Sequence, residues 1–172
     1  NVESGRQPAI IKALGHQNVA FISGPLDHPD AEQRLAGYRA ELARREMGVD
    51  DALVVYSDYQ ESGGFRAMNQ LLESRVNFSA VVAANDQMAY GARLALHRAG
   101  LRVPDDISLV GFDDLPHSAF TLPPLTSVRQ SVYEIGSSAA QAMIDLLSKK
   151  TPPARMIAAE IIVRESTRIC RR

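Results

Sequence analysis

The sequence has a single cysteine, no tryptophan and no marked excess of charge of either sign. Cys170 is the only cysteine among 172 residues, which excludes a disulfide framework and any metal site built from a cysteine cluster. The chain has 19 Lys and Arg residues against 20 Asp and Glu residues, a net charge of -1. It therefore has no overall positive field that would hold it on DNA or on an anionic membrane.

Long apolar runs and a leader segment are missing as well. No apolar run approaches the roughly 18 residues that span a bilayer. The chain begins at Asn1 without a methionine, a basic segment or an apolar segment, so we expect no signal peptide, and the missing methionine suggests a fragment or a processed product. With 45% hydrophobic and 23% charged residues, the composition is that of an ordinary globular protein.

Four short apolar runs, separated by segments of helical periodicity, predict an α/β fold. None of the runs alternates strictly with polar residues, which is typical of strands that are covered on both faces. Strands that alternate with helices of this length require an open parallel sheet with right-handed crossovers and helices on both faces. The four runs are residues 19–22, 53–56, 80–84 and 107–110.

The helices between these runs have recognisable ends. Asp30 is the expected N-cap of the first helix and Ser62 that of the second. The third helix is expected to begin at Asp86 and to end at Gly100. The glycine pair at 63–64 is interpreted as a turn at the start of the second helix rather than as an anion-binding loop.

The last third of the chain shows a different pattern. Residues 115–125, with three prolines, are the clearest irregular connection. The basic tail, residues 164–172, is interpreted as a solvated end. Between these two we expect an extended segment, a helix and a last apolar run, at residues 126–129, 131–147 and 157–163.

Polar side chains follow each of the first four apolar runs. Ligands of open parallel sheets bind beyond the carboxyl ends of the strands, and Arg34, expected on the first turn of the first helix, falls at the same rim. Carboxylate, carboxamide, guanidinium and aromatic ring together suit a neutral polyol, whereas several acids would repel a phosphate. The residues that follow the runs are Ser23-Gly24, Asp58-Tyr59, Asn85-Asp86 and Asp113-Asp114.

Each of these residues also has a purely structural interpretation. Asp86 can be a helix N-cap and Asp114 a turn residue. Tyr59 can be a packing residue, and Arg34 a surface partner of Glu32. Their convergence on one rim is what favours a ligand site.

Patterns typical of enzymes and metal sites are absent. The sequence has no Gly-x-Ser-x-Gly elbow, no phosphate-binding glycine-rich loop and no His-x-x-x-His or cysteine pair. Its four histidines are scattered and are expected at surface or capping positions. Asp113 and Asp114 point to opposite sides of an extended chain, which argues against a carboxylate pair for acid–base catalysis. We therefore expect no enzyme, no metal and no cofactor.

Two segments resemble a known family. Residues 82–92 read VAANDQMAYGA and residues 101–114 read LRVPDDISLVGFDD. Both are similar to segments of bacterial transcription regulators of the lactose/galactose-repressor (LacI/GalR) family, the first to the motif ANDxMAxGA. The resemblance covers nearly the whole chain in the family's order. Supporting matches lie at residues 14–16, 34–38, 123–128 and 162–167.

The resemblance implies how the chain is divided. Members of the family have a helix-turn-helix headpiece and a two-lobed effector domain like that of periplasmic binding proteins. Residues 1–128 would form the C-terminal lobe, residues 129–157 a strand and a helix of the N-terminal lobe, and residues 158–172 the return to the C-terminal lobe. The headpiece and most of the N-terminal lobe would be absent. The apolar stripe of the helix over 131–147 would then be covered by missing sequence or by another chain.

The resemblance also implies functional residues. The effector contacts, carried over by position, are Arg34, Tyr59, Asn85 and Asp113, with Gln130 at the crossover as a further candidate. The subunit interface would include one face of the helix over residues 86–99 and the loop around residues 118–122. Its implied residues are Met88, Ala92, Phe120 and Leu122.

The implied protein is a cytoplasmic, dimeric transcription regulator. A sugar effector would favour one relative orientation of the lobes and so alter operator binding through the headpieces. The alternative is a periplasmic sugar-binding protein of a transport system, which shares the fold and the strand-end chemistry. The Arg-Glu-Ser-Thr and Pro-Pro-Leu-Thr segments favour the regulator. A sugar-modifying hydrolase would need an acid–base pair or a metal that the sequence does not offer.

Overall fold

The computed structural model describes residues 14–153 and 157–170, and its strands form one six-stranded sheet. The strand order is β2-β1-β3-β4-β5-β6, in which β6 is antiparallel to β5 and all other neighbours are parallel. The predicted α/β class is confirmed, and the four apolar runs form β1 to β4. The strands are β1 Val19–Ser23, β2 Val54–Tyr56, β3 Ala80–Ala83, β4 Ser108–Asp113, β5 Thr126–Arg129 and β6 Glu160–Ile162.

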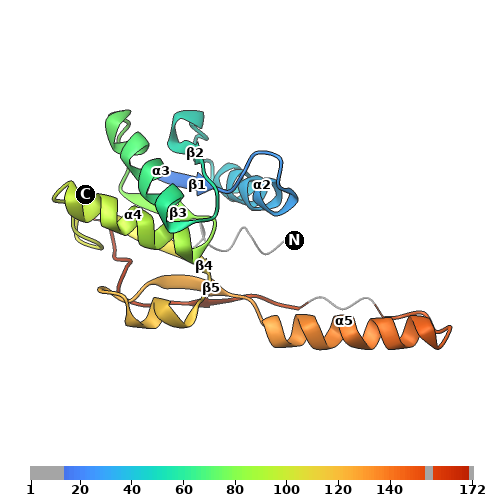
Figure 1. The fold of residues 1–172 in the computed structure, drawn as a ribbon. Helices are drawn as coiled ribbons and strands as arrows, with labels where there is room; N and C mark the ends of the chain where they lie inside the picture. Colours follow the sequence, from blue (N-terminus) through green and yellow to red (C-terminus); the bar gives the residue numbers. More distant parts are fainter. Residues whose placement is uncertain (1–13, 154–156, 171–172) are drawn as a thin grey trace.

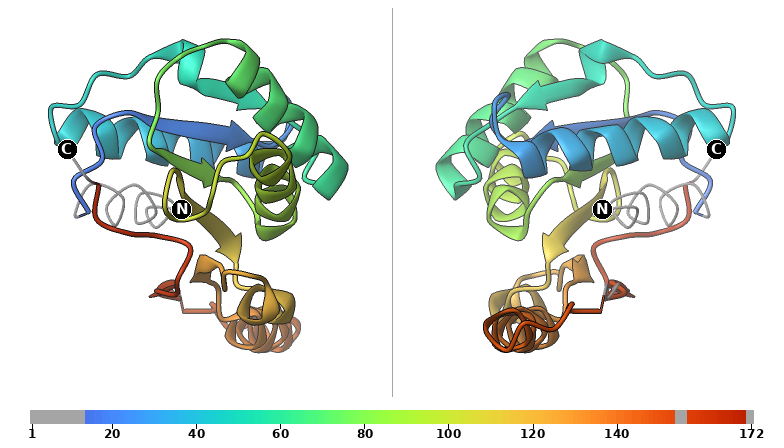
Figure 2. Two further views of the ribbon diagram at one scale, coloured as in Figure 1. Left: turned by 90° about the vertical axis from the view of Figure 1, so that its left-hand side faces the viewer. Right: turned by 90° about the vertical axis from the view of Figure 1, so that its right-hand side faces the viewer.

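Helices cover both faces of this sheet, as predicted. The α-helices are α2 Pro29–Arg44, α3 Glu61–Glu73, α4 Asp86–Arg98 and α5 Val132–Leu147, and short 3-10 helices are η2 Asp51–Leu53 and η3 Pro116–Phe120. One face is covered by α2 and the opposite face by α3 and α4 (Figure 2). Within the described ranges no helix combines the length and the apolar character that crossing a membrane requires.

The first long helix begins earlier than the sequence predicted. It starts at Pro29, and His28 is its N-cap, with the ring nitrogen Nδ1 accepting a hydrogen bond from the Asp30 amide at 3.3 Å. The prediction of Asp30 as the cap is wrong, because proline at the first helical position has the right φ and lacks only an amide that would have no partner there. Arg34 consequently lies on the second turn rather than the first.

The second helix also differs at its start. It begins at Glu61 without a side-chain cap, so Ser62 lies inside it and is not the cap. The glycine pair 63–64, expected in a turn, is buried within the first turn of α3. Both have a packing role: Gly64 lies against the backbone of Met88 where α3 and α4 run against each other (Figure 1), and Gly63 lies against the side chains of Ser57 and Asp58.

The third helix begins at Asp86, as predicted, and Asn85 is its N-cap, with Oδ1 accepting a hydrogen bond from the Met88 amide at 2.9 Å. The interpretation of Asp86 as the cap is therefore wrong. Met88 and Ala92, implied as interface residues, are both 0% exposed in the single chain. They belong to its own core, so their side chains cannot form a subunit interface.

The C-terminal tail is not a solvated end over its described part. Ser166 is buried; its Oγ donates to the Leu109 carbonyl at 2.6 Å and accepts from the Thr126 amide at 2.8 Å. It thus bridges β4 and β5. Arg168 forms an ion pair with Asp105 at 2.6 Å. The segment after β6 is therefore fixed to the sheet by side-chain bonds.

The helix over Val132–Leu147 extends away from the rest of the molecule (Figure 1). None of its residues is buried, and residues of its predicted apolar stripe, such as Val132 at 73% and Leu146 at 59%, are largely exposed. The prediction that the apolar stripe has little to pack against is confirmed for residues 14–153 and 157–170. What covers the stripe stays a prediction.

Candidate functional site

The carboxyl ends of the parallel strands meet at one edge of the sheet. Ser23 at the end of β1 pairs with Tyr56 at the end of β2, and Asp113 at the end of β4 pairs with Arg129 at the end of β5. The loops that follow these strands therefore start side by side. The sequence argument placed a ligand site at this edge, and we refer to Arg34, Tyr59, Asn85 and Asp113 as the strand-end site.

Arg34 is the centre of the strand-end site. Its side chain is 14% exposed; Nη1 donates to the Ala84 carbonyl beyond β3, and Nη2 lies 3.8 Å from Oδ1 of Asp113. The guanidinium lies over the Phe112 ring, with 4.1 Å from Cζ to the centroid. A planar cation held against a ring and a carbonyl keeps its remaining donors in a fixed direction.

Tyr59 and Asn85 are joined by a direct bond. The Asn85 side-chain amide donates to the Tyr59 carbonyl at 2.9 Å, and this bond fixes the loop between β2 and α3 against the start of α4. The Tyr59 ring centroid is 5.8 Å from Cζ of Arg34, and the ring contacts His28 edge to face at 5.4 Å. Burial raises the pKa of Tyr59. Asn85 thus has a positional role besides any contact to a ligand.

Asp113 has an unusual backbone and an unusual acidity. Its φ is 107° and that of Asp114 is 52°, conformations that side-chain-bearing residues adopt rarely and that concentrate at functional sites. Burial raises the pKa of Asp113 to about 6; Arg34 opposes the rise, and Asp86 and Asp30 add to it. At neutral pH it is a carboxylate that lacks full compensation and can accept further hydrogen bonds.

The structure joins four of the five predicted effector residues and leaves Gln130 apart. Gln130 is half-buried, one residue beyond β5; its carbonyl accepts from the Val132 amide at 2.9 Å. Sequence analysis missed Phe112 and His28, which contact Arg34 and Tyr59. Phe112 directly precedes Asp113 in the strand-end motif, so its position was a usable signal. His28 gave none beyond a capping position.

Several buried hydroxyls at this edge have no hydrogen-bond partner among the described residues. They are Oγ of Ser23 at the end of β1, Oγ of Ser57 after β2 and the phenol oxygen of Tyr59. An unpaired buried hydroxyl costs about 1–3 kcal/mol. A ligand with hydroxyl groups would recover part of this cost.

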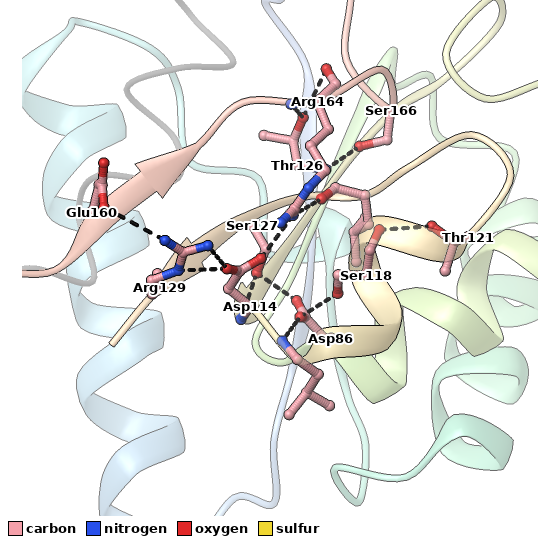
Figure 3. A network of polar contacts seen from close by, with 12 residues as sticks. Asp86, Asp114, Ser118, Thr121, Thr126, Ser127, Arg129, Glu160, Arg164 and Ser166 are labelled. Atoms are coloured by element: carbon pink, nitrogen blue, oxygen red, sulfur yellow. Dashed lines mark hydrogen bonds and ion pairs between the residues drawn. The ribbon is translucent and has the colours of Figure 1, made fainter. Parts of the chain in front are cut away.

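Of the other strand-end acids, Asp58 forms an exposed ion pair with Arg66 at 2.8 Å, and Asp86 and Asp114 belong to a separate buried network (Figure 3). Asp114 forms ion pairs with Arg164 and Arg129, both at 2.7 Å, so it is more than the turn residue considered from sequence. Asp86 accepts hydrogen bonds from two serines and one amide; burial raises its pKa, and these bonds oppose the rise. Both acids are committed to the protein itself.

No group of three or more His, Cys, Asp and Glu side chains able to hold a metal occurs within residues 14–153 and 157–170. Asp113 and Asp114 have different partners, Arg34 on one side and Arg129 with Arg164 on the other. They therefore do not form a carboxylate pair. The groups that the strand-end site presents are hydrogen-bonding side chains and an aromatic ring.

An exposed apolar loop lies on another part of the surface. Phe120 is 83% and Leu122 is 90% exposed, and Arg93 of α4 donates to the Leu122 carbonyl at 3.0 Å. A groove of about 400 Å³ lies beside this loop and includes Leu94 and Leu122. Large apolar side chains exposed together on a fixed loop are typical of a protein contact.

The sequence of this chain is similar to one protein family and to repressors of bacterial operons. The sequence profile of the family described as "periplasmic binding protein-like domain" matches residues 10–167. The ribose operon repressor of Escherichia coli (strain K12) is 41% identical over 137 residues, which are 80% of this chain and 42% of that protein. The chain thus spans less than half the length of this relative.

Solved structures agree with the sequence comparison. A sugar-binding transcriptional regulator of the LacI family from Escherichia coli, complexed with phosphate, has a TM-score of 0.93 at 34% identity, over 98% of this chain and 61% of that chain. The lac repressor dimer bound to operator and the anti-inducer ONPF has a TM-score of 0.90 at 31% identity, over 96% of this chain and 58% of that chain. Both similar proteins are transcription regulators.

Proposed function

We propose a function from the family of this chain, which belongs to the LacI family and matches its periplasmic-binding-protein-like domain. The chain would bind a small neutral sugar at the strand-end site. Sugar binding would in turn control DNA binding by the whole regulator. The observation that carries the proposal is the pair of Arg34 and Asp113 at 3.8 Å. A cation and an anion side by side present donors and acceptors together, as vicinal hydroxyl groups require.

The surroundings of this pair support a neutral ligand. Burial raises the pKa of Asp113, and Arg34 is the cation that opposes this rise. Asp30 and Asp86 add negative charge nearby. A phosphate would meet these acids, whereas a sugar hydroxyl can donate to Asp113 and accept from Arg34. The partly exposed ring of Tyr59 beside Arg34 provides apolar surface for the C–H side of a sugar, and Phe112, 4% exposed, supports the guanidinium from below.

The division of the chain into lobes is part of the proposal. Residues 1–128 would form the C-terminal lobe, residues 129–157 the part of the N-terminal lobe in this chain, and residues 158–172 the return. Of the strand and helix predicted for 129–157, the described residues hold α5 and Arg129, the last residue of β5. Helix α5 supports this division, because none of its residues is buried. Nothing within residues 14–153 and 157–170 covers its apolar stripe. Gln130, at the crossover, would then contact the effector from between the lobes.

Dimerisation and DNA binding are proposed for the whole protein. The similar lac repressor structure is a dimer bound to operator, and the loop with Phe120 and Leu122 supplies an exposed apolar surface in this chain. Operator contact would be made by a headpiece outside this chain. The protein would act in the cytoplasm, where operator DNA lies, and not as an enzyme, since the similar proteins are regulators.

Titration with D-ribose, D-galactose, cellobiose and inorganic phosphate tests the proposed ligand class. We expect at least one sugar to bind and phosphate not to compete with it.

Asp113→Asn is expected to weaken sugar affinity by roughly 100-fold, because a hydrogen bond to a charged group contributes about 1.5–3 kcal/mol. Since the pKa of Asp113 is raised to about 6, protonation removes the acceptor in acid, so affinity should fall as the pH drops below about 6.

The pH profile separates Asp113 from other acids. In Asp113→Asn the fall in affinity between about pH 7 and pH 5 should disappear, whereas Glu165→Gln, a change of an exposed carboxyl, should leave affinity and profile as in the parent. Isothermal calorimetry measures both. Sugar binding with parental affinity in Asp113→Asn, or binding of phosphate alone, would contradict the proposed site.

Changing the exposed loop tests the proposed dimer. Phe120→Asp together with Leu122→Asp is expected to shift the protein to monomer, because two charges would be buried in an apolar contact. Val49→Asp, at a 40% exposed apolar residue after α2, is the control and should not change the oligomeric state. Sedimentation velocity distinguishes the species. A double variant that sediments like the parent would rule out this interface.

A further inference from the structure

Asp86 is a fully buried acid that the strand-end site does not use. Its side chain is 0% exposed, and its bonds are made to hydroxyls and to one backbone amide rather than to a cation. Oδ1 accepts from Ser127 Oγ at 2.6 Å, and Oδ2 accepts from Ser118 Oγ at 2.6 Å and from the Leu115 amide at 2.8 Å. One carboxylate thus joins α4, β5 and the loop after β4 (Figure 3).

The first arm of this network holds the backbone directly after Asp113. Ser127 Oγ, which donates to Asp86, accepts from the Asp114 amide at 3.1 Å. The next amide, that of Leu115, donates to Asp86 itself. Asp113 and Asp114 both have positive φ, a conformation that persists only where the surroundings determine it. The two bonds linked to Asp86 contribute to that determination, beside the ion pairs of Asp114 with Arg129 and Arg164.

The second arm holds the loop that carries the exposed apolar residues. Ser118 Oγ lies 2.7 Å from the Tyr90 hydroxyl and donates to Asp86. The Ser118 carbonyl accepts from the Leu125 amide at 2.8 Å and from Thr121 Oγ1 at 3.2 Å. These bonds close the loop on both sides of Phe120, so its position depends on Ser118 and through it on Asp86.

The neighbouring strand is shaped to admit this carboxylate. A Cβ atom on Gly111 of β4 would lie 2.1 Å from Oδ1 of Asp86, closer than any real contact. The side chain therefore occupies the space that a larger residue at 111 would need. Such a fit is typical of a group with a fixed position rather than of an acid that happens to be buried.

We propose that Asp86 is a positioning residue that fixes both the backbone presenting Asp113 and the loop 116–123 from a single buried carboxylate. Its functional consequence rests on the proposed function: if Asp113 binds the sugar and the loop binds the second subunit, one side chain sets the geometry of both. The two arms share this carboxylate but are separate, because Ser127 holds the backbone after Asp113 and Ser118 holds the loop.

Serine variants separate the two arms. Amide hydrogen exchange of the protein, followed by mass spectrometry, reports each arm without any ligand. Ser127→Ala should speed exchange roughly tenfold or more in residues 113–115 and leave residues 117–125 as in the parent. Ser118→Ala should do the reverse. Asp86→Asn should loosen at least one arm, because its carboxamide nitrogen donates and cannot accept from the serines.

The core provides the reference for this experiment. In all three variants, amide exchange in the centre of β1 and β3 should stay as in the parent. Faster exchange there would indicate a general loss of stability rather than a local loosening of one arm. Equal loosening of both segments by either serine variant, or parental exchange in Asp86→Asn, would overturn the proposal. Since no sugar is used, the result is independent of whether the proposed ligand class is right.

Discussion

Replacing Arg34 by alanine is expected to weaken sugar binding by roughly 100-fold or more. The variant loses the guanidinium donors proposed to bind the sugar, a contact of about 1.5–3 kcal/mol for a charged donor. It also leaves the Ala84 carbonyl without the bond it accepts from Arg34 and removes the cation 3.8 Å from Asp113. Both changes act at the strand-end site itself.

A second effect of this substitution acts through Asp113. Arg34 is the group that opposes the rise in the pKa of Asp113 caused by burial. Without it the pKa moves further above 6, so part of the carboxyl is protonated at neutral pH. The affinity that remains in Arg34→Ala should therefore recover as the pH is raised above neutral, in contrast to the parent, whose affinity should level off there.

Arg39→Ala is the matched control for Arg34→Ala. Arg39 lies on the same helix and forms an ion pair with Asp51 at 2.7 Å, but its side chain is 44% exposed and that of Asp51 is 82% exposed. Exposed pairs contribute about 0–1 kcal/mol, so sugar affinity should stay parental. Calorimetry with the sugar that binds the parent measures both variants. Arg34→Ala with affinity within a few-fold of the parent would remove Arg34 from the site.

The strand-end site could be predicted because its residues follow directly from the strand positions. Once residues 80–84 and 107–110 are interpreted as parallel strands, the rule for open sheets places Asn85 and Asp113 at one edge. The structure confirms the sheet that this argument requires. The contacts within the site depend on side-chain directions, which the positions alone do not give.

Errors in the prediction have local physical causes. His28 replaced Asp30 as the cap of α2 because Pro29 starts the helix two residues earlier. The roles of Asp86 and Ser166 depend on partners 29 to 57 residues away in the chain, and no spacing pattern indicates such pairs. The resemblance assigned Met88 to an interface from its position in the sequence. Its burial depends on which face of α4 packs on the sheet, and in the structure Met88 lies on that buried face.

The tight contact between α3 and α4 leads to the largest expected loss of stability. A Cβ atom on Gly91 of α4 would lie 1.8 Å from the Glu61 carbonyl oxygen, and one on Gly64 of α3 would lie 2.1 Å from the Met88 carbonyl oxygen. Each helix thus needs glycine where the backbone of the other approaches. Because backbone atoms cannot move aside as a side chain can, the helices must separate to admit a methyl group.

Gly91→Ala is therefore expected to lower the free energy of unfolding by about 3 kcal/mol or more, beyond the usual 1–3 kcal/mol of overpacking. Helix propensity alone predicts the opposite sign, a gain of about 0.8–1 kcal/mol for alanine over glycine. Urea unfolding followed by circular dichroism decides between them, with the midpoint compared at unchanged slope. A variant as stable as the parent would show that α3 and α4 are not in close contact.

Gly48→Ala provides the control, since a Cβ atom there has no neighbour within 4 Å, and its unfolding midpoint should stay parental. The same separation of helices should also weaken sugar binding in Gly91→Ala. Tyr59 precedes α3 and Asn85 precedes α4, and the bond between them is 2.9 Å long. Moving one helix away from the other lengthens that bond, so the stability of the helix pair and the geometry of the strand-end site depend on the same two glycines.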